Sequence, residues 1–284
     1  MKGCSADEGV SSVETNRMTT RLKGKWVLIT GASSGFGAAA APAFGAEGSR
    51  LLLGARRLDR LEQVAAESRR AGASEAHFRA LDVSQTASAD AFVAWACQTI
   101  APEQPSAARL DVLINNAGGA HGLDPVAQGK DEDWEAMLQS NVLGLLRMTR
   151  AALPLLLSNP GSSIINIGSV AGRVAYEGGA AYCAAKAGEL LITRTLRLEL
   201  NGTGIRVCTV DPGLAETEFS LVRFKGDAAR ARKVYEGTQP LTAKDIAEIL
   251  VWVASRPPHV NIDELLVKPV DQAAMHKIYR RKAG

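Results

Sequence analysis

A tyrosine and a lysine, Tyr182 and Lys186, stand four positions apart in the stretch Tyr-Cys-Ala-Ala-Lys. On an α-helix this spacing places both side chains on one face, one turn apart. A free tyrosine has a pKa near ~10, whereas a nearby ammonium group favours the phenolate and lowers that pKa. The pair therefore predicts acid–base chemistry at a carbonyl or hydroxyl group. Taken alone, the pattern also occurs by chance on any amphipathic helix.

A glycine-rich stretch, Thr-Gly-Ala-Ser-Ser-Gly-Phe-Gly, begins at Thr30 and joins a predicted strand to a predicted helix. Its glycines allow a tight turn and let a pyrophosphate approach the helix N-terminus. The spacing G-x-x-x-G-x-G differs from the G-x-G-x-x-G of many dinucleotide-binding proteins. The stretch nevertheless predicts a dinucleotide site, with contacts from Gly31, Ser33, Ser34, Gly35, Phe36 and Gly37.

Arg56 and Arg57 directly follow the second predicted strand, where a protein that prefers NAD usually carries an acid for the ribose 2′-hydroxyl. Arginine suits a 2′-phosphate instead, so the pair favours NADP(H). The alternative is that both are solvated charges at the start of a charged helix. Asp82 and Val83 end the third strand, where the Asp82 carboxylate accepts a hydrogen bond either from adenine or from the next helix N-terminus.

Short apolar runs alternate with longer helical patterns along the chain, which is typical of βαβ units. This α/β order predicts a Rossmann-like, doubly wound, seven-stranded parallel sheet with helices on both faces, in a single domain. The segment 213–238 shows neither pattern, and we expect a mobile, charged loop there. Strands are expected at 26–30, 50–54, 76–80, 112–115, 163–168, 205–210 and 264–267, and helices near 36–47, 57–71, 86–100, 131–157, 177–201 and 242–255.

The charge balance excludes several classes of partner. The 284 residues carry 33 basic and 30 acidic side chains, a formal net charge of +3. Because the two signs are interspersed, we expect no nucleic-acid partner. The cysteines and histidines lack metal-ligand spacing, so neither a metal site nor a disulfide framework is predicted, and free thiols fit the cytoplasm. No run is long enough for a membrane span.

Three segments divide the chain. Residues 1–22 are polar and small without an apolar h-region, so we expect a disordered leader rather than a secretory signal. Residues 23–270 carry the strand and helix patterns and form the predicted catalytic domain. The tail 271–284 contains several basic residues and is either a disordered end or reaches a neighbouring subunit.

In combination, these residues resemble the short-chain dehydrogenase/reductase family over residues 25–270. The family's motifs occur in its order: the glycine loop, Asn115-Asn116-Ala117-Gly118, Asn141, Ser169, Tyr182 with Lys186, and Asp211-Pro212-Gly213. Singly, each residue also has a structural explanation, such as a strand-end turn for Ser169 or a helix kink for Asn141. The resemblance implies a nicotinamide cofactor and oxidoreduction at a CH–OH group.

The resemblance also implies a role for each site residue. Tyr182 is the general acid in carbonyl reduction and the base in alcohol oxidation, Lys186 lowers its pKa and binds the nicotinamide ribose, and Ser169 holds the substrate oxygen. Asn141 keeps a water in a proton relay from Lys186 to solvent. The implied cofactor contacts also include Asn116, Ala117, Gly118, Tyr182, Lys186, Pro212, Gly213, Leu214 and Thr217.

The C-terminal third resembles one branch of the family more closely, the NADP-dependent 3-hydroxy acid dehydrogenases, which also oxidise serine and allo-threonine. The likeness lies in the segments 217–227, 234–235 and 258–262. It implies a cytoplasmic homotetramer that acts on a small 3-hydroxy acid. The carboxylate of that acid needs a cation, and Arg223 or Arg173 offers a planar fork for it. Alternatively, Arg223 is a surface charge on a loop.

Two other functions are compatible with the same motifs. The same chemistry could act on a bulkier ketone or aldehyde or on a 3-oxoacyl thioester, although the mixed charges give no basic docking patch for a carrier protein. A non-catalytic protein that senses NADP would bind the cofactor without turnover. The intact set Ser169, Tyr182 and Lys186 argues against a sensor, because a sensor needs no proton donor.

Overall fold

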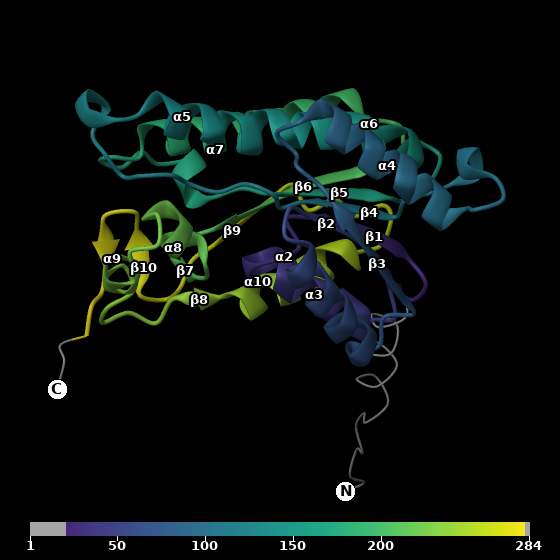
Figure 1. The fold of residues 1–284 in the computed structure, drawn as a ribbon, viewed down its shortest axis with the longest axis horizontal. Helices are drawn as coiled ribbons and strands as arrows, with labels where there is room; N and C mark the ends of the chain where they lie inside the picture. The colour runs from purple at the N-terminus through teal and green to yellow at the C-terminus, as the bar shows by residue number, and fades with distance from the viewer. Residues whose placement is uncertain (1–20, 282–284) are drawn as a thin grey trace, which may run out of the picture.

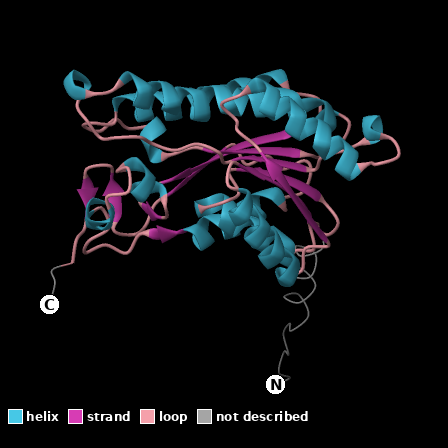
Figure 2. Cartoon of the chain, in the orientation of Figure 1, coloured by secondary structure: helices cyan, strands magenta, loops and turns pink. Residues whose placement is uncertain are grey.

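The computed structural model describes residues 21–281, which form a seven-stranded parallel sheet between two layers of helices (Figures 1 and 2). The strand order is β3-β2-β1-β4-β5-β6-β9, which is doubly wound and reverses between β1 and β4. The predicted fold class and its seven strands are confirmed. The strands are β1 (Trp26–Thr30), β2 (Arg50–Ala55), β3 (Glu75–Ala80), β4 (Val112–Asn115), β5 (Ser163–Ile167), β6 (Arg206–Pro212) and β9 (Glu264–Val267).

Buried aliphatic side chains on both faces of the sheet hold the two helix layers. In β1, Val27 and Ile29 belong to one hydrophobic cluster and Leu28 to the other, so successive side chains point to opposite faces. Because both faces are covered, the strand is a continuous apolar run. One layer contains α2 (Gly35–Ala46), α3 (Leu58–Ala71) and α10 (Ala243–Ala254), and the other contains α4 (Thr86–Ile100), α6 (Gly144–Leu157) and α7 (Ala180–Glu199) (Figure 1).

One wide turn interrupts the long helix predicted at 131–157. The helix α5 (Asp131–Met137) is followed by a π-helical turn, η3 (Leu138–Leu143), before α6 begins. Asn141 lies in that turn, fully buried, and its side-chain amide donates to the carbonyl oxygens of Met137 at 2.7 Å and Gly119 at 2.9 Å. Turns of this kind are frequent at functional sites. The helical pattern alone did not predict the turn, because α5 and α6 continue on either side of it.

Short elements replace the loop predicted at 213–238. This segment contains β7 (Ala215–Glu216), α8 (Phe219–Arg223) and α9 (Ala228–Lys233), and β7 pairs with β8 (Leu241–Thr242). The C-terminal segment adds a hairpin of β10 (Gln272–Ala274) and β11 (Lys277–Ile278).

The first part of the predicted tail packs on its own chain. The Asp271 carboxylate accepts hydrogen bonds from the Gln239 backbone at 2.7 Å and from Arg281 at 2.6 Å. Residues 271–281 are therefore not a disordered end.

The predicted leader, residues 1–22, lies almost wholly outside the described residues. Its last residue, Leu22, is buried with 3% exposure, and Arg21 donates to the Ser255 carbonyl oxygen at 3.1 Å. The folded region thus begins before the predicted boundary at residue 23. Within residues 21–281, no helix combines the length and the hydrophobicity needed to cross a membrane, and no three His, Cys, Asp or Glu side chains cluster as metal ligands would.

Candidate functional site

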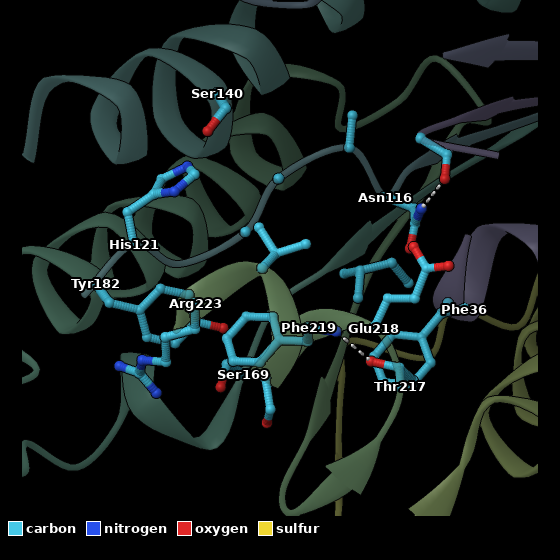
Figure 3. Close-up of a pocket in the computed structure, with 18 of the residues that line it drawn as sticks. Phe36, Asn116, His121, Ser140, Ser169, Tyr182, Thr217, Glu218, Phe219 and Arg223 are labelled. Carbon is cyan, nitrogen blue, oxygen red and sulfur yellow. Dashed lines mark hydrogen bonds between the residues drawn. The ribbon is translucent and has the colours of Figure 1, made fainter. Parts of the chain in front are cut away.

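A large cavity lies beyond the carboxyl ends of the central strands and brings most of the predicted site residues together (Figure 3). Its volume is about 990 Å³, at the upper end of the usual size of ligand sites. Of the predicted residues, Gly37, Asn141 and Arg173 do not line it. The predicted residues that do are Gly31, Ser33, Ser34, Gly35, Phe36, Arg56, Arg57, Asp82, Val83, Asn116, Ala117, Gly118, Ser169, Tyr182, Lys186, Pro212, Gly213, Leu214, Thr217 and Arg223.

The backbone of the glycine loop passes close to neighbouring segments because two of its positions lack a side chain. Gly31 has a φ of 65°, and a Cβ there would come within 2.8 Å of the Ala117 Cα. A Cβ on Gly37 would lie 2.5 Å from Asn116 Nδ2 and 2.7 Å from the Gly31 carbonyl oxygen. Gly37 therefore supports the site from behind the cavity wall.

The N-terminus of α2 is suited to an anion. Ser34 is the N-cap residue but makes no side-chain capping hydrogen bond, so the first N–H groups of α2 are available to a phosphate. Together with the close approach permitted at Gly31, this fits a dinucleotide pyrophosphate.

Arg56 and Arg57 line the cavity beside the glycine loop, where the sequence predicts a 2′-phosphate. Arg57 donates from Nε to Ser33 Oγ at 3.4 Å, and its Nη2 forms an ion pair with Glu218 Oε2 at 3.0 Å. Both side chains of this pair are well exposed, so the pair is weak. A phosphate at this place can replace the Glu218 carboxylate as the partner of Arg57.

The Asp82 carboxylate bonds to the turn that precedes α4 and also lines the cavity, and its contact with adenine stays a prediction. Its Oδ1 accepts hydrogen bonds from the Ser84 backbone at 3.0 Å and the Ser84 hydroxyl at 2.7 Å, and the residue also lines the cavity with Val83. Burial raises the pKa of Asp82, but the hydrogen bonds from Ser84 and the charge of Arg56 outweigh it and hold the pKa below its usual range. Asp82 is therefore an ionised acceptor at the cavity edge.

Asn116 and Asn141 fix the backbone that follows β4. Asn116 Nδ2 donates to the carbonyl oxygens of Thr30 at 2.9 Å and Gly31 at 3.2 Å, which joins this segment to the glycine loop. Asn141 Oδ1 accepts from the Gly119 N–H at 3.1 Å and occupies the space that a Cβ on Gly118 would fill. Asn141 thus holds the cavity wall from behind, and its part in a proton relay stays a prediction.

Tyr182 and Lys186 lie on the first two turns of α7, and the Ser169 hydroxyl accepts a hydrogen bond from the Ala171 N–H at 3.1 Å. Figure 3 shows Tyr182 and Ser169 on the same side of the cavity as Arg223. Tyr182 is 8% exposed and Lys186 7%. Burial raises the pKa of Tyr182, and Lys186 and Ser169 lower it without reversing that effect.

The expected low pKa of Tyr182 is therefore wrong for this structure. Lys186 acts in the predicted direction, but burial of the phenol outweighs it, and the charge of Glu189 also raises the pKa. Tyr182 keeps its proton at neutral pH, which is the form that protonates a carbonyl oxygen.

Glu189 is a site residue that sequence reasoning missed. Lys186 Nζ donates to both of its carboxylate oxygens, at 3.0 and 2.9 Å, and to the Ile167 carbonyl oxygen at 2.9 Å. Burial raises the pKa of Glu189 to about 7, against the opposing effect of Lys186. The available signal was an acid three positions after a lysine on one helix face.

Arg173 does not face the cavity, so the prediction that it anchors a substrate is wrong. Its Nε donates to Asp211 Oδ2 at 2.7 Å, and its Nη2 donates to Glu264 Oε2 at 2.7 Å. A guanidinium shared between two carboxylates has its charge already compensated. Arg173 instead joins the end of η4 (Val170–Gly172) to β6 and β9.

Arg223 differs from Arg173, because the groups that contact its guanidinium among residues 21–281 are uncharged. Its Nε donates to the Gly122 carbonyl oxygen at 3.1 Å, and its Nη2 donates to the Tyr176 hydroxyl. The guanidinium carbon lies 5.4 Å from the ring centroids of Tyr176 and Tyr182 and 5.7 Å from that of Phe219. Two N–H groups are used in this way, and the remaining three are available to an anion beside Tyr182.

Part of the cavity wall comes from the C-terminal part of the chain. Gln272 Oε1 accepts from the Leu214 N–H at 2.7 Å and fills the space beside Gly213, while Thr217 Oγ1 accepts from the Phe219 N–H at 3.2 Å. Met275 and Ile278, from the predicted tail, also line the cavity. No local sequence pattern marked these two residues.

The sequence matches a family model described as short chain dehydrogenase over residues 25–226. It is 41% identical over 265 residues to the NADP-dependent 3-hydroxy acid dehydrogenase of Schizosaccharomyces pombe, covering 93% of this chain and 100% of the relative. It is 44% identical over 248 residues to a sulfoacetaldehyde reductase of Chromohalobacter salexigens, covering 87% of this chain and 94% of the relative.

The fold is also similar to that of a solved structure, the closed form of serine dehydrogenase complexed with NADP+. The two share a TM-score of 0.81 and 39% sequence identity, over 90% of this chain and 100% of the other.

Proposed function

Because the chain belongs to the short chain dehydrogenases, we propose that it is an NADP(H)-dependent oxidoreductase that interconverts a small 3-hydroxy acid and its 3-oxo form. The proposed substrates are of the serine, allo-threonine or 3-hydroxypropanoate type. The proposed assembly is a cytoplasmic homotetramer. The observation that carries it is the neutral surrounding of Arg223, which leaves a cation beside the phenol of Tyr182 for the acid group of the substrate.

The glycine loop, the N-terminus of α2 and Arg57 would hold the cofactor, with Arg56 and Arg57 on the 2′-phosphate side. When bound, NADP(H) supplies or accepts the hydride. The protein positions the two partners and manages the proton.

Tyr182 moves the proton that accompanies the hydride. In reduction its phenol protonates the carbonyl oxygen, and in oxidation its phenolate takes the hydroxyl proton. The Ser169 hydroxyl donates to the same substrate oxygen and orients it. Lys186 stabilises the phenolate, and Asn141 orders the backbone at the start of the relay to solvent.

The assay follows NADPH formation and consumption by the full chain, with Tyr182→Phe as the control for chemistry. We expect turnover of L-serine, L-allo-threonine or 3-hydroxypropanoate with NADP+, lowered by at least about 100-fold in the variant because general acid–base catalysis typically contributes that much. A preference for NAD+ would contradict the role given to Arg56 and Arg57. NADPH binding without consumption by any carbonyl compound would point to a sensor.

A sulfonate can replace the carboxylate at Arg223, since one of the relatives is named sulfoacetaldehyde reductase. The assay therefore includes 2-hydroxyethanesulfonate beside the hydroxy acids. Turnover of only an aryl ketone or a 3-oxoacyl thioester would move the assignment to a bulkier substrate and leave Arg223 without its anchoring role.

A further inference from the structure

The carboxylate of Glu189 is buried against Lys186 outside the cavity lining, and the proposed reaction does not use it. The side chains of Lys186 and Glu189 are 8% and 5% exposed. An ammonium group has three N–H donors, and those of Lys186 are matched by three oxygen acceptors, both carboxylate oxygens of Glu189 and the Ile167 carbonyl. Glu189 thus determines where the Lys186 ammonium lies.

The pair also changes the charge that Tyr182 experiences. Lys186 Nζ lies 5.9 Å from the centroid of the Tyr182 ring, and a lone ammonium at this distance would favour the phenolate. A carboxylate bonded to the same ammonium through both oxygens compensates most of that charge. The phenolate is therefore stabilised less than the tyrosine–lysine pair alone would predict.

We propose that Glu189 is a positioning residue that acts through Lys186 and sets how readily Tyr182 gives up its proton, an inference that rests on the proposed acid–base role of Tyr182. With Glu189 ionised, Tyr182 holds its proton to higher pH and favours carbonyl reduction. With Glu189 protonated or removed, the charge of Lys186 acts on Tyr182 alone and favours the phenolate needed for alcohol oxidation.

The charged groups around Glu189 keep its own titration in the neutral range. Lys186, on the same helix, favours the carboxylate, whereas burial and the charge of Asp211, on β6, oppose it, and the resulting pKa is about 7. Asp211 is itself paired with Arg173, which also binds Glu264 of β9. The charge that Glu189 places beside Lys186 therefore changes near neutral pH.

The test compares the pH dependence of kcat/KM for wild type and Glu189→Gln, in both directions, with the alcohol that the wild type oxidises fastest. We expect the midpoint of the oxidation profile to fall by about one pH unit, the low end of what a neighbouring charge produces, with a parallel fall for reduction. Glu199→Gln removes an exposed charge from the same helix and should leave both midpoints unchanged. A midpoint that stays within about 0.3 pH unit of the wild-type midpoint would overturn the inference.

Two further variants separate the possible failures. If Glu189→Gln unfolds below the assay temperature, Glu189→Asp is used instead, because it retains the charge on a shorter side chain. A fall of about half a pH unit in the midpoint of the oxidation profile then supports the inference, whereas an unchanged midpoint overturns it. Tyr182→Phe distinguishes the two proposals. An inactive Tyr182→Phe with an unshifted Glu189→Gln rejects only the role of Glu189, whereas a fully active Tyr182→Phe rejects the proposed chemistry and this inference together.

Discussion

The cofactor side and the substrate side of the cavity are built by different means. On the cofactor side, backbone and small residues at the ends of β1 and β4 approach so closely that Gly31 and Gly37 have no room for a side chain. On the substrate side, side chains from distant segments meet, as when Arg223 bonds to Gly122 and Tyr176. The first construction tolerates little change, whereas the second can alter its ligand by single substitutions.

The largest expected effect comes from crowding the cofactor side. Gly37→Ala places a methyl group against Asn116 and the Gly31 carbonyl, and we expect about 100-fold weaker binding of both NADPH and NADH, equivalent to about 3 kcal/mol. Fluorescence titration with each nucleotide measures it. Gly188→Ala is the matched control, because Gly188 does not line the cavity and a Cβ there would make only an ordinary contact, 3.5 Å from the Val142 side chain. Equal binding by the two variants would contradict the idea that close packing defines this side.

A smaller and more selective effect is expected on the substrate side. Arg223→Ala should raise the KM of a hydroxy acid about 30-fold, since a hydrogen bond to a charged group is worth about 1.5–3 kcal/mol, while the KM of NADPH stays near wild type. A neutral alcohol should be affected much less. Arg230→Ala is the control, because Arg230 stacks over Phe224 of the same segment, 4.4 Å from its ring centroid. A comparable loss with acid and alcohol would reject the anchoring role.

The smallest effect is expected for Arg57, a side chain on the cofactor side that is not closely packed. Arg57→Ala should weaken NADPH binding by about 10-fold and leave NADH binding unchanged, because only the 2′-phosphate distinguishes the two nucleotides. Arg60→Ala serves as a comparison, since Arg60 also lies within 3.8 Å of Glu218. If NADH binding falls as far as NADPH binding, Arg57 supports the loop rather than reading the phosphate.

The same contrast explains what the sequence could predict. The sheet was predictable because its central strands are mostly apolar runs buried on both faces, and the glycine loop because its requirements lie within eight consecutive residues. The choice between Arg173 and Arg223 was not, because the partners of Arg173 are 38 and 91 positions away. The direction of the pKa of Tyr182 also depends on its burial, which belongs to the assembled fold and not to the tyrosine–lysine spacing.

The hairpin of β10 and β11 lies beyond residue 226, where the family match ends, yet it contributes Met275 and Ile278 to the cavity wall and binds Leu214 through Gln272. A protease that cut the chain just before this hairpin would leave the seven-stranded sheet whole and open the cavity to solvent. A fusion tag placed close to Arg281 therefore stands only a few residues from the wall of the cavity.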